Sequence, residues 1–359
     1  MLPRVQSVLK LRRLLPFLLL AAFGVVAAAD KDDLRVTDYF VTHESNDPFY
    51  ALAKIDNRIS LHVREVVIAG REQAAAADGK VLLLLHGGTL PGYVAFDSNN
   101  ENCSLMRYLA RAGWDTFALD FQGFGLSTRP KIMDDPAAFP SSKAPMRLDV
   151  TIRDVERAAD FITNFRGVTN IHVLGWSQGA SLEAPAYAIR HRERVAKLVL
   201  FAGTDNLAQG AEQKAKTAAE REAQKVGSSA PELKAWAGLG TKAEFVVQSC
   251  FDAYSTAHLA SDPKSAELGG KFRFPTGRFI DLNSPGPLFD ASRITVPTLL
   301  IRGDSDTFAT RDGNRELLRK LSSQKKELIE IPNAGHFLMF EKAQAQFFET
   351  VKTFLDARQ

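Results

Sequence analysis

The sequence predicts an α/β protein built on one open, mostly parallel β-sheet with helices on both faces. Two observations support this prediction. Short runs of apolar residues recur along the chain, such as residues 81–85, which lie between turn-forming glycines. Such a run is typical of a strand buried on both faces, as in a parallel sheet covered by helices. Segments with helical periodicity separate most of these runs, and that alternation predicts right-handed crossovers within a single sheet.

The elements follow this pattern in order. In the first predicted strand, Ile59, Leu61 and Val63 alternate with polar residues. A period of two is typical of a half-buried strand, here interpreted as antiparallel, whereas the polar sequence between residue 30 and this strand is interpreted as irregular. Buried strands are then predicted at 81–85, 114–119, 171–174, 195–201, 297–301 and 328–331. Helices are predicted at 105–112, 149–165, 178–190, 311–321 and 341–357.

A long insertion, residues 204–293, interrupts the alternation and is far longer than a crossover loop needs to be. It contains a polar helical stretch at 211–226, a more apolar one at 242–260, and an exit rich in proline and glycine. We interpret residues 204–293 as a helical cap, called the cap segment below, inserted into a core of residues 30–203 and 294–359. Its aromatic residues are expected mainly to pack it onto that core, and lining a pocket is the alternative: Trp236, Phe245, Phe251, Tyr254, Phe272, Phe274 and Phe279.

Residues 1–29 have the composition of a secretory signal peptide. An apolar stretch occupies 14–29 and ends in small residues before Asp30. The segment has no acidic residue, and its basic residues are Arg4, Lys10, Arg12 and Arg13. A basic region, an apolar region and small residues at the end predict cleavage after Ala29. The mature protein is therefore expected to be periplasmic or secreted.

The alternative for this segment is a permanent membrane anchor. The apolar stretch 14–29 contains Pro16 and Gly24 and has 16 residues, whereas a spanning helix needs about 20. The sequence therefore favours a cleaved signal, with no stable membrane anchor afterwards. The pair Arg12-Arg13 leaves both the general and the twin-arginine export routes open.

Without the signal, the chain is nearly neutral. Basic residues fall from 45 to 41 against 42 acidic residues, so the net charge changes from +3 to about −1. That balance offers no basic surface to a nucleic acid, so no such partner is expected.

Cys103 and Cys250 are the two cysteines, and both a disulfide and two separate thiols fit the sequence. Neither has the spacing of a metal ligand, so no metal or cofactor is expected, and the oligomeric state stays open.

The pattern Gly175-x-Ser177-x-Gly179 ends a predicted strand and precedes a predicted helix. A serine hydroxyl is a weak nucleophile until geometry and a neighbouring base activate it. A sharp strand-to-helix turn supplies the geometry by lifting the side chain clear of the sheet edge. Glycines flank this turn where a side chain would collide. Ser177 is therefore the candidate nucleophile.

The candidate base is His336. It ends the sequence Pro332-Asn333-Ala334-Gly335-His336 after the last predicted strand. A loop at that place lies at the carboxyl edge of the sheet, where open α/β sheets bind their ligands. The histidine accepts a proton at neutral pH. The other six histidines lie in strands, at a helix end, near the irregular start, in the cap segment or in the glycine loop considered below.

Two carboxylates compete to orient this histidine. Asp304 and Asp306 both follow the predicted strand at 297–301. Side chains two positions apart in a turn point in different directions, so one is expected to face His336 while the other pins the turn. Asp205, at the entrance to the cap segment, is a third candidate. We rank Asp306 first, Asp304 second and Asp205 third.

The backbone N–H groups of Gln178 and Gly88 are the predicted donors to an oxyanion. Gln178 directly follows the candidate nucleophile. Gly88 belongs to the loop His86-Gly87-Gly88-Thr89, whose glycines let the backbone approach a ligand closely. Thr89 is the alternative donor on this loop. His86 is expected to shape the loop through local hydrogen bonds and not to act as a second base.

Five motifs in this order make the chain resemble the α/β-hydrolase family, in its capped branch with a serine nucleophile. They are His86-Gly87-Gly88, Asp120-x-x-Gly-x-Gly-x-Ser127, Gly175-x-Ser177-x-Gly179, Gly303-x-x-Asp306 and Gly335-His336. The second motif is interpreted as a structural turn. The resemblance runs from about residue 59 to the C-terminus. It implies an eight-stranded, mostly parallel sheet whose second strand is antiparallel, with the cap inserted after the sixth strand, and a triad in the order nucleophile, acid, base.

Two features depart from the family's pattern. Pro185 lies inside the predicted helix behind the nucleophile and should kink it. The glycine loop lacks the Pro-Gly continuation of members that resemble proline iminopeptidase, which argues against a peptidase. A serine at position 177 also disfavours the dehalogenase and epoxide-hydrolase branches, whose nucleophile is an aspartate.

The sequence thus predicts an exported serine hydrolase that cleaves a small-molecule carbonyl substrate, a carboxylic ester or a lactone, through an acyl-enzyme. Ser177 is the nucleophile, His336 the base and Asp306 the orienting acid. Hydrolysis of a carbon–carbon or amide bond on the same triad is the alternative chemistry. A member of the fold that binds a ligand without turnover is the alternative of another class.

Overall fold

The computed structural model describes residues 25–26, 34–98 and 100–358. The predicted signal peptide therefore lies outside the described residues, apart from Val25 and Val26. These two residues form β1, which pairs antiparallel with β2. Among the described residues, no helix combines the length and the apolar character needed to cross a membrane.

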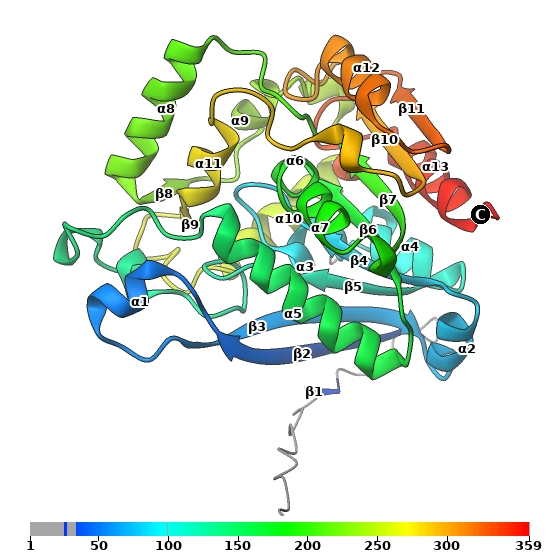
Figure 1. The fold of residues 1–359 in the computed structure, drawn as a ribbon, viewed down its shortest axis with the longest axis horizontal. Helices are drawn as coiled ribbons and strands as arrows, with labels where there is room; N and C mark the ends of the chain where they lie inside the picture. Colours follow the sequence, from blue (N-terminus) through cyan, green and yellow to red (C-terminus); the bar gives the residue numbers. More distant parts are fainter. Residues whose placement is uncertain (1–24, 27–33, 99, 359) are drawn as a thin grey trace, which may run out of the picture.

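The core is a single sheet with the strand order β1-β2-β3-β5-β4-β6-β7-β10-β11 (Figure 1). Apart from β1, its eight strands are β2 (Leu34–Glu44), β3 (Arg58–Ile68), β4 (Val81–Leu85), β5 (Asp115–Leu119), β6 (Ile171–Trp176), β7 (Val195–Phe201), β10 (Thr298–Gly303) and β11 (Lys326–Ile331). β3 is antiparallel to both neighbours, β2 and β5. From β5 to β11 all pairs are parallel. The predicted sheet, with its antiparallel second strand, is confirmed.

One expectation for the core was wrong. Residues 34–44, interpreted as irregular, form the eleven-residue strand β2. Its register with β3 runs from Leu34 opposite Ile68 to Glu44 opposite Arg58. The polar residues of β2 find partners on the next strand: Asp38, for example, accepts hydrogen bonds from Arg64 at 2.8 and 3.0 Å. Cross-strand pairs of this kind stabilise β2, although the polar composition of residues 34–44 does not indicate a strand.

Helices cover both faces of the sheet, as predicted. Leu83 and Leu85 of β4 face the cluster that α5 (Leu148–Arg166), α7 (Glu183–Arg190) and α12 (Arg311–Lys320) complete. Leu82 and Leu84 face the cluster of α4 (Leu105–Arg111) and α13 (Gln344–Asp356). Alternate residues of β4 thus pack into the hydrophobic clusters on opposite faces of the sheet. This explains why the strand has no polar face. In Figure 1, α5 crosses the near face of the sheet. Short helices in the connections are α1 (Pro48–Ala53), α2 (Glu72–Ala77) and α3 (Gly92–Phe96).

The helix behind Ser177 is broken. Instead of one helix over 178–190, the structure has α6 (Gln178–Ser181) and α7, separated at Leu182, whose φ and ψ are −123° and −72°. Pro185 lies in the first turn of α7, where its missing N–H costs no hydrogen bond. The predicted kink is confirmed, as a break three residues before the proline.

The cap segment lies between β7 and β10 and contains several helices joined by long irregular connections. Its helices are α8 (Ala211–Gln224), α9 (Leu233–Ala237), α10 (Gln248–Ala260) and α11 (Gly277–Leu282). It also contains a two-stranded antiparallel sheet of β8 (Val226–Ser229) and β9 (Phe272–Pro275), which the expectation of a helical cap did not include. The two strands are short and lie far apart in the sequence, so neither shows a pattern of its own. Figure 1 shows α8, α9 and α11 together on the side of the core where α6 begins.

The two cysteines join the cap segment to the core. Cys103, just before α4, forms a disulfide with Cys250 of α10, with the Cα atoms 5.9 Å apart. Both side chains are fully buried. Of the two states that the sequence allowed, the structure has the disulfide.

Candidate active site

Ser177 occupies a strained turn between β6 and α6. Its φ is +56° and its ψ is −115°, a conformation that residues with a side chain rarely adopt. Neighbouring glycines make room for the turn: a Cβ on Gly175 would lie 2.5 Å from the Gly179 carbonyl oxygen, and a Cβ on Gly179 would lie 2.4 Å from that of Leu85. The collisions expected at both glycines are confirmed. The chain thus tolerates strain at Ser177 only because its neighbours lack side chains.

Three side chains from three loops form one hydrogen-bonded chain. Ser177 Oγ lies 2.8 Å from His336 Nε2, and His336 Nδ1 lies 2.9 Å from Asp306 Oδ2. The loops follow β6, β11 and β10, so all three side chains lie at the carboxyl edge of the sheet. With Nδ1–H donating to the carboxylate, Nε2 is free to accept the serine proton. This is the arrangement that activates a serine hydroxyl as a nucleophile.

Of the three candidate acids, only Asp306 bonds His336. Its other oxygen accepts the N–H groups of Phe308 at 2.8 Å and Ala309 at 3.0 Å, which hold the carboxylate in place. Asp304 instead accepts the N–H groups of Asn333 and Ala334 at 3.1 and 3.2 Å, and so pins the loop that leads to the histidine. Burial raises the pKa of Asp304, but the hydrogen bonds outweigh it and lower the pKa overall.

Asp205 has a different partner altogether. Its carboxylate lies 2.8 Å from the ammonium group of Lys320 on α12, and its backbone carbonyl accepts the N–H of Leu288. The side chain is buried in this ion pair. The structure therefore does not bring Asp205 together with His336.

The loop after β4 places Gly88 beside Ser177. A Cβ on Gly87 would lie only 3.2 Å from Ser177 Cβ, which measures how closely the loop approaches. Within the part of the chain that the structure describes, the N–H groups of Gly88 and Gln178 donate to no protein acceptor. Both are therefore available to a ligand. The N–H of Thr89, the alternative donor, also has no protein acceptor among the described residues, and the Thr89 carbonyl accepts a hydrogen bond from His258 of α10 at 3.0 Å.

His86 shapes this loop, as expected. Its Nδ1 donates to the Gly87 carbonyl at 2.8 Å, and its Nε2 accepts the Phe121 N–H at 3.2 Å. Full burial lowers the pKa of His86 well below its usual value, and the charge of Arg278 lowers it further. The ring stays neutral with both nitrogens occupied, so it is not a second base.

The comparison with family models decides what this fold is. Residues 80–343 match the model described as the alpha/beta hydrolase fold. The match covers well over half of the chain and includes Ser177, Asp306 and His336. The chain belongs to the α/β hydrolase fold family. A comparison with curated proteins finds no match.

Solved α/β hydrolase structures share this architecture at low sequence identity. An esterase from Exiguobacterium antarcticum has a TM-score of 0.59 at 14% identity, covering 89% of this chain and 99% of its own. An enol-lactonase from Burkholderia xenovorans has a TM-score of 0.55 at 17% identity, covering 83% of this chain and 97% of its own. A meta-cleavage product hydrolase from Pseudomonas fluorescens has a TM-score of 0.54 at 16% identity, covering 83% of this chain and 94% of its own. At such identities the likeness concerns the fold alone.

In this α/β hydrolase, Glu341 anchors the loop that carries His336. Its buried carboxylate accepts the N–H groups of Gly335 at 2.7 Å and Phe337 at 3.2 Å, on either side of the histidine. Thr241 of the cap segment donates its hydroxyl to the same carboxylate at 2.7 Å. Burial raises the pKa of Glu341, although these hydrogen bonds oppose the rise. The sequence interpretation missed this role because Glu341 counted only as the first residue of the last predicted helix.

Arg278 of α11 ties the cap segment to the glycine loop. Its guanidinium donates to the carbonyls of Gly87 at 2.8 Å and His86 at 3.1 Å, and to both carboxylate oxygens of Glu183 at 2.7 and 2.8 Å. Both charged side chains are fully buried. In a trans peptide the C=O and N–H point in opposite directions, so the bond to the Gly87 carbonyl turns the Gly88 N–H away from the arginine. No sequence motif marks this pair, since 95 residues separate its members.

The aromatic residues of the cap segment mainly pack against the core, as expected. Trp236 stacks on Phe337, the residue after His336, with ring centroids 4.1 Å apart. Tyr254 packs against Phe340 at 5.2 Å. Phe279 is the exception, because its ring reaches the glycine loop: a Cβ on Gly88 would lie 2.9 Å from its Cζ.

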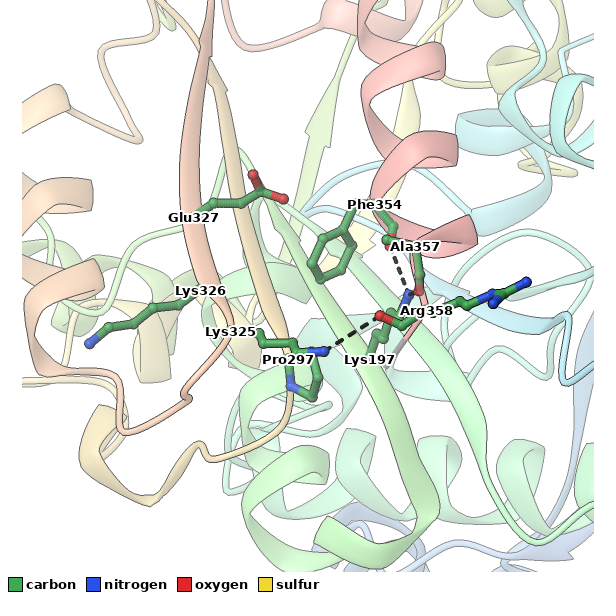
Figure 2. Close-up of a pocket in the computed structure, with 8 residues that line it drawn as sticks. All are labelled: Lys197, Pro297, Lys325, Lys326, Glu327, Phe354, Ala357 and Arg358. Carbon is green, nitrogen blue, oxygen red and sulfur yellow. Dashed lines mark hydrogen bonds between the residues drawn. The ribbon is translucent and has the colours of Figure 1, made fainter.

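The pocket in Figure 2 is unrelated to this site. It has a volume of about 270 Å³ and is lined by Lys197, Pro297, Lys325, Lys326, Glu327, Phe354, Ala357 and Arg358. These residues lie near the amino ends of β7, β10 and β11 and at the end of α13, whereas the triad lies at the carboxyl ends. The Lys197 ammonium is already bonded to the carbonyls of Phe354 and Leu355, each at 2.8 Å. The pocket therefore offers no free cation from Lys197.

Across the described part of the chain, no group of three or more His, Cys, Asp or Glu side chains is arranged to hold a metal ion. The chemistry that the site offers comes from the serine, the histidine, the carboxylate and two main-chain donors.

Proposed function

We propose that this α/β hydrolase cleaves a carboxylic ester or a lactone through an acyl-enzyme intermediate. The observation that carries the proposal is the unbroken hydrogen-bonded chain Asp306–His336–Ser177, with unpaired N–H groups of Gly88 and Gln178 beside the serine. Such a chain produces a nucleophile, and two converging N–H groups match the negative charge that develops on a carbonyl oxygen under attack.

In the acylation step, Ser177 Oγ attacks the carbonyl carbon while its proton passes to His336 Nε2. The Gly88 and Gln178 N–H groups donate to the resulting oxyanion. The imidazolium is stabilised by the Asp306 carboxylate, and it then protonates the leaving alkoxide. For a lactone the leaving hydroxyl stays attached to the acyl group.

In the deacylation step, His336 removes a proton from water, which attacks the acyl carbon. The second tetrahedral intermediate uses the same oxyanion donors, and its collapse returns the proton to Ser177. Each donor of this kind contributes roughly 10²–10³-fold to the rate in serine hydrolases.

The same triad also suits hydrolysis of an amide or a carbon–carbon bond, and the fold also accommodates a member that binds without turnover. These alternatives share Ser177 and differ in the bond cleaved. The esterase and lactonase names of the structural relatives agree with our first choice, but the choice is a proposal that an activity panel must test.

The decisive experiment is stoichiometric labelling with a fluorophosphonate, followed by a substrate panel. We expect one label per chain in the wild type and none in Ser177→Ala. Ser292→Ala, which removes an exposed hydroxyl bonded to Asp290, should label like the wild type. The panel contains p-nitrophenyl esters of increasing acyl length, lactones, anilides and β-diketones. A folded wild type that takes no label would refute the proposal that the protein is a serine hydrolase. Turnover of anilides or diketones alone would refute the assignment of an ester or lactone as the substrate.

We also propose that the protein is exported, with cleavage after Ala29. The buried disulfide between Cys103 and Cys250 supports an oxidising compartment, because disulfides are rare in the reducing cytosol. The mature chain should begin at Asp30. Sequencing the N-terminus of the protein from its native host checks this. A mature protein that still contains residues 14–29 would contradict the proposal.

A further inference from the structure

The side chain of Gln178 is buried without using its hydrogen-bonding capacity. The residue is 2% exposed. Both its amide oxygen and its amide nitrogen are buried, and neither bonds any other residue that the structure describes. Leaving a buried polar group unpaired costs about 1–3 kcal/mol. Gln178 is the first residue of α6 and directly follows Ser177. Packing alone does not explain why a side chain with an unpaired carboxamide occupies this position.

The carboxamide lies against the glycine loop, next to the site of reaction. A Cβ on Gly88 would lie 2.9 Å from both Cδ and Oε1 of Gln178, and 2.9 Å from the Phe279 ring. The carboxamide, the Gly88 main chain and the Phe279 ring thus meet at one point. The main-chain N–H of the same residue is the proposed oxyanion donor, so the carboxamide lies within one side-chain length of the scissile carbonyl.

The other polar side chains around this point are already satisfied. The guanidinium of Arg278 donates hydrogen bonds to Glu183 and to the carbonyls of His86 and Gly87. His86 has both ring nitrogens occupied. The positive charge of Arg278 is neutralised by Glu183. The guanidinium of Arg221 lies 5.2 Å from the centroid of the Phe279 ring and is hydrogen-bonded to Gln224. A neutral partner that both donates and accepts satisfies both atoms of the Gln178 carboxamide, whereas a carboxylate would leave its amide oxygen without a donor.

We propose that the Gln178 carboxamide recognises the substrate, and that the ester or lactone carries a hydroxyl or carboxamide group within two to four bonds of its scissile carbonyl carbon. A primary amide presents an acceptor and a donor side by side. A hydroxyl or an amide group pairs with both, whereas an alkyl group would leave the buried carboxamide unsatisfied. The inference rests on the proposed function, since it names a substrate class for that same site.

A site built to bond a polar group rejects an analogue that lacks it far more strongly than an apolar pocket rejects an extra methylene. The signature of this role is therefore a ratio of kcat/KM between matched substrates, not the activity on any one of them. Gln178→Met keeps the length and shape of the side chain and removes its hydrogen bonds. The variant retains the main-chain N–H, so labelling of Ser177 by a fluorophosphonate reports whether its site is still assembled.

The experiment measures hydrolysis in a pH-stat. For the acyl side, methyl 2-hydroxybutanoate and methyl 3-hydroxybutanoate are compared with methyl butanoate. For the leaving-group side, 2-hydroxyethyl butanoate is compared with ethyl butanoate. In the wild type we expect one arm to show a preference of roughly ten- to a hundredfold for the hydroxylated ester, the value of one to two hydrogen bonds. Gln178→Met should bring that ratio close to one. Gln248→Met, which changes an exposed glutamine bonded to Asp252, should keep the wild-type ratio.

Two results would overturn the inference: a wild-type ratio near one in both arms, or an unchanged ratio in Gln178→Met. Either result leaves the proposed function standing if methyl butanoate is hydrolysed. If no ester and no lactone of the panel is hydrolysed, the proposed function fails, and the recognition role is read from binding instead. Protection of Ser177 against fluorophosphonate by 1-hydroxybutan-2-one must then exceed protection by butan-2-one in the wild type and lose this advantage in Gln178→Met. Equal protection by the two ketones would overturn it.

Discussion

Two carboxylates at the end of β10 have separate tasks although one residue lies between them. Asp306 bonds the imidazole of His336 and is fixed by two main-chain N–H groups. Asp304 bonds two N–H groups of the neighbouring loop instead. One carboxylate therefore acts on the histidine ring, and the other acts on the backbone that carries it.

This division predicts a ranking of variants. Asp306→Asn removes the charge that holds the Nδ1–H tautomer and stabilises the imidazolium, so kcat should fall about 10³–10⁴-fold. Asp304→Asn should cost much less, because an amide oxygen still accepts an N–H. Asp205→Asn should leave kcat nearly unchanged, since its partner is Lys320. Steady-state kinetics on the best ester from the panel checks the order, and a larger loss in Asp304→Asn than in Asp306→Asn would contradict it.

The residues that sequence reasoning found and those it missed differ in how their partners are placed. Ser177 and His336 lie in short local patterns, because a tight turn or a loop after a strand needs glycine nearby. Glu341 and Arg278 bond main-chain groups whose direction only the folded loops determine. Nothing local in the sequence could therefore predict that these two side chains hold the site together.

Among the elements, the β2–β3 pair contains a buried charged cluster. His62 of β3 is fully buried, with Nδ1 2.8 Å from Asp120 and Nε2 2.9 Å from Asp38. Burial alone would lower the pKa of His62, but the charges and hydrogen bonds of Asp120 and Asp38 outweigh it and raise the pKa to about 9. The imidazolium thus joins both strands to the turn that begins at Asp120.

The cluster predicts a pH-dependent stability with a defined sign. Because the pKa of His62 is higher in the folded state, its stabilisation is complete below the unfolded value of about 6.5 and is lost as the pH rises through about 9. The full shift corresponds to roughly 3 kcal/mol. Urea unfolding at pH 6, 7.5 and 9 measures the loss, and His62→Gln serves as the control for other titrating groups. The stability gap between wild type and His62→Gln should shrink with rising pH; parallel profiles would contradict the prediction.

At this scale the sequence predicted buried elements better than edge elements. The strands β4 to β7 are buried on both faces and mostly apolar, so their runs identify them without any knowledge of their partners. The strand β2 and the pair β8–β9 depend on partners, such as Glu65 for Arg35 and the ring of Phe274 for Gly227. Their pairing energy comes from contacts across strands, which a single segment of sequence does not show.

For the molecule as a whole, the cap segment contacts every loop of the site. Arg278 bonds the glycine loop, and Thr241 bonds the carboxylate that anchors the histidine loop. At the acid loop, Gly240 has no side chain because a Cβ there would lie 1.8 Å from the Ser305 carbonyl oxygen. Ser177 itself is only 8% exposed. The cap segment therefore holds in place the loops that carry Gly88, His336 and Asp306.

The disulfide is the covalent part of this attachment. It joins residues 147 positions apart and fixes α10, whose His258 donates to the Thr89 carbonyl at the glycine loop. Burial lowers the pKa of His258 to about 3, so the ring is neutral and this donor is independent of pH in the physiological range. Loosening α10 should therefore affect both the stability of the molecule and the loop that carries Gly88.

Replacing both cysteines tests this connection. Cys103→Ala/Cys250→Ala should lower the free energy of unfolding by about 2–5 kcal/mol, because the link no longer restricts the unfolded chain. The variant should also lose part of its kcat, since the Thr89 end of the glycine loop loses support from α10. Urea unfolding under non-oxidising and oxidising conditions measures the first effect, and the same ester assay measures the second. Wild type treated with a reductant should approach the stability of the variant, whereas the variant should not respond to it. A variant as stable as the oxidised wild type would show that the covalent link between the cap segment and the core contributes nothing to stability.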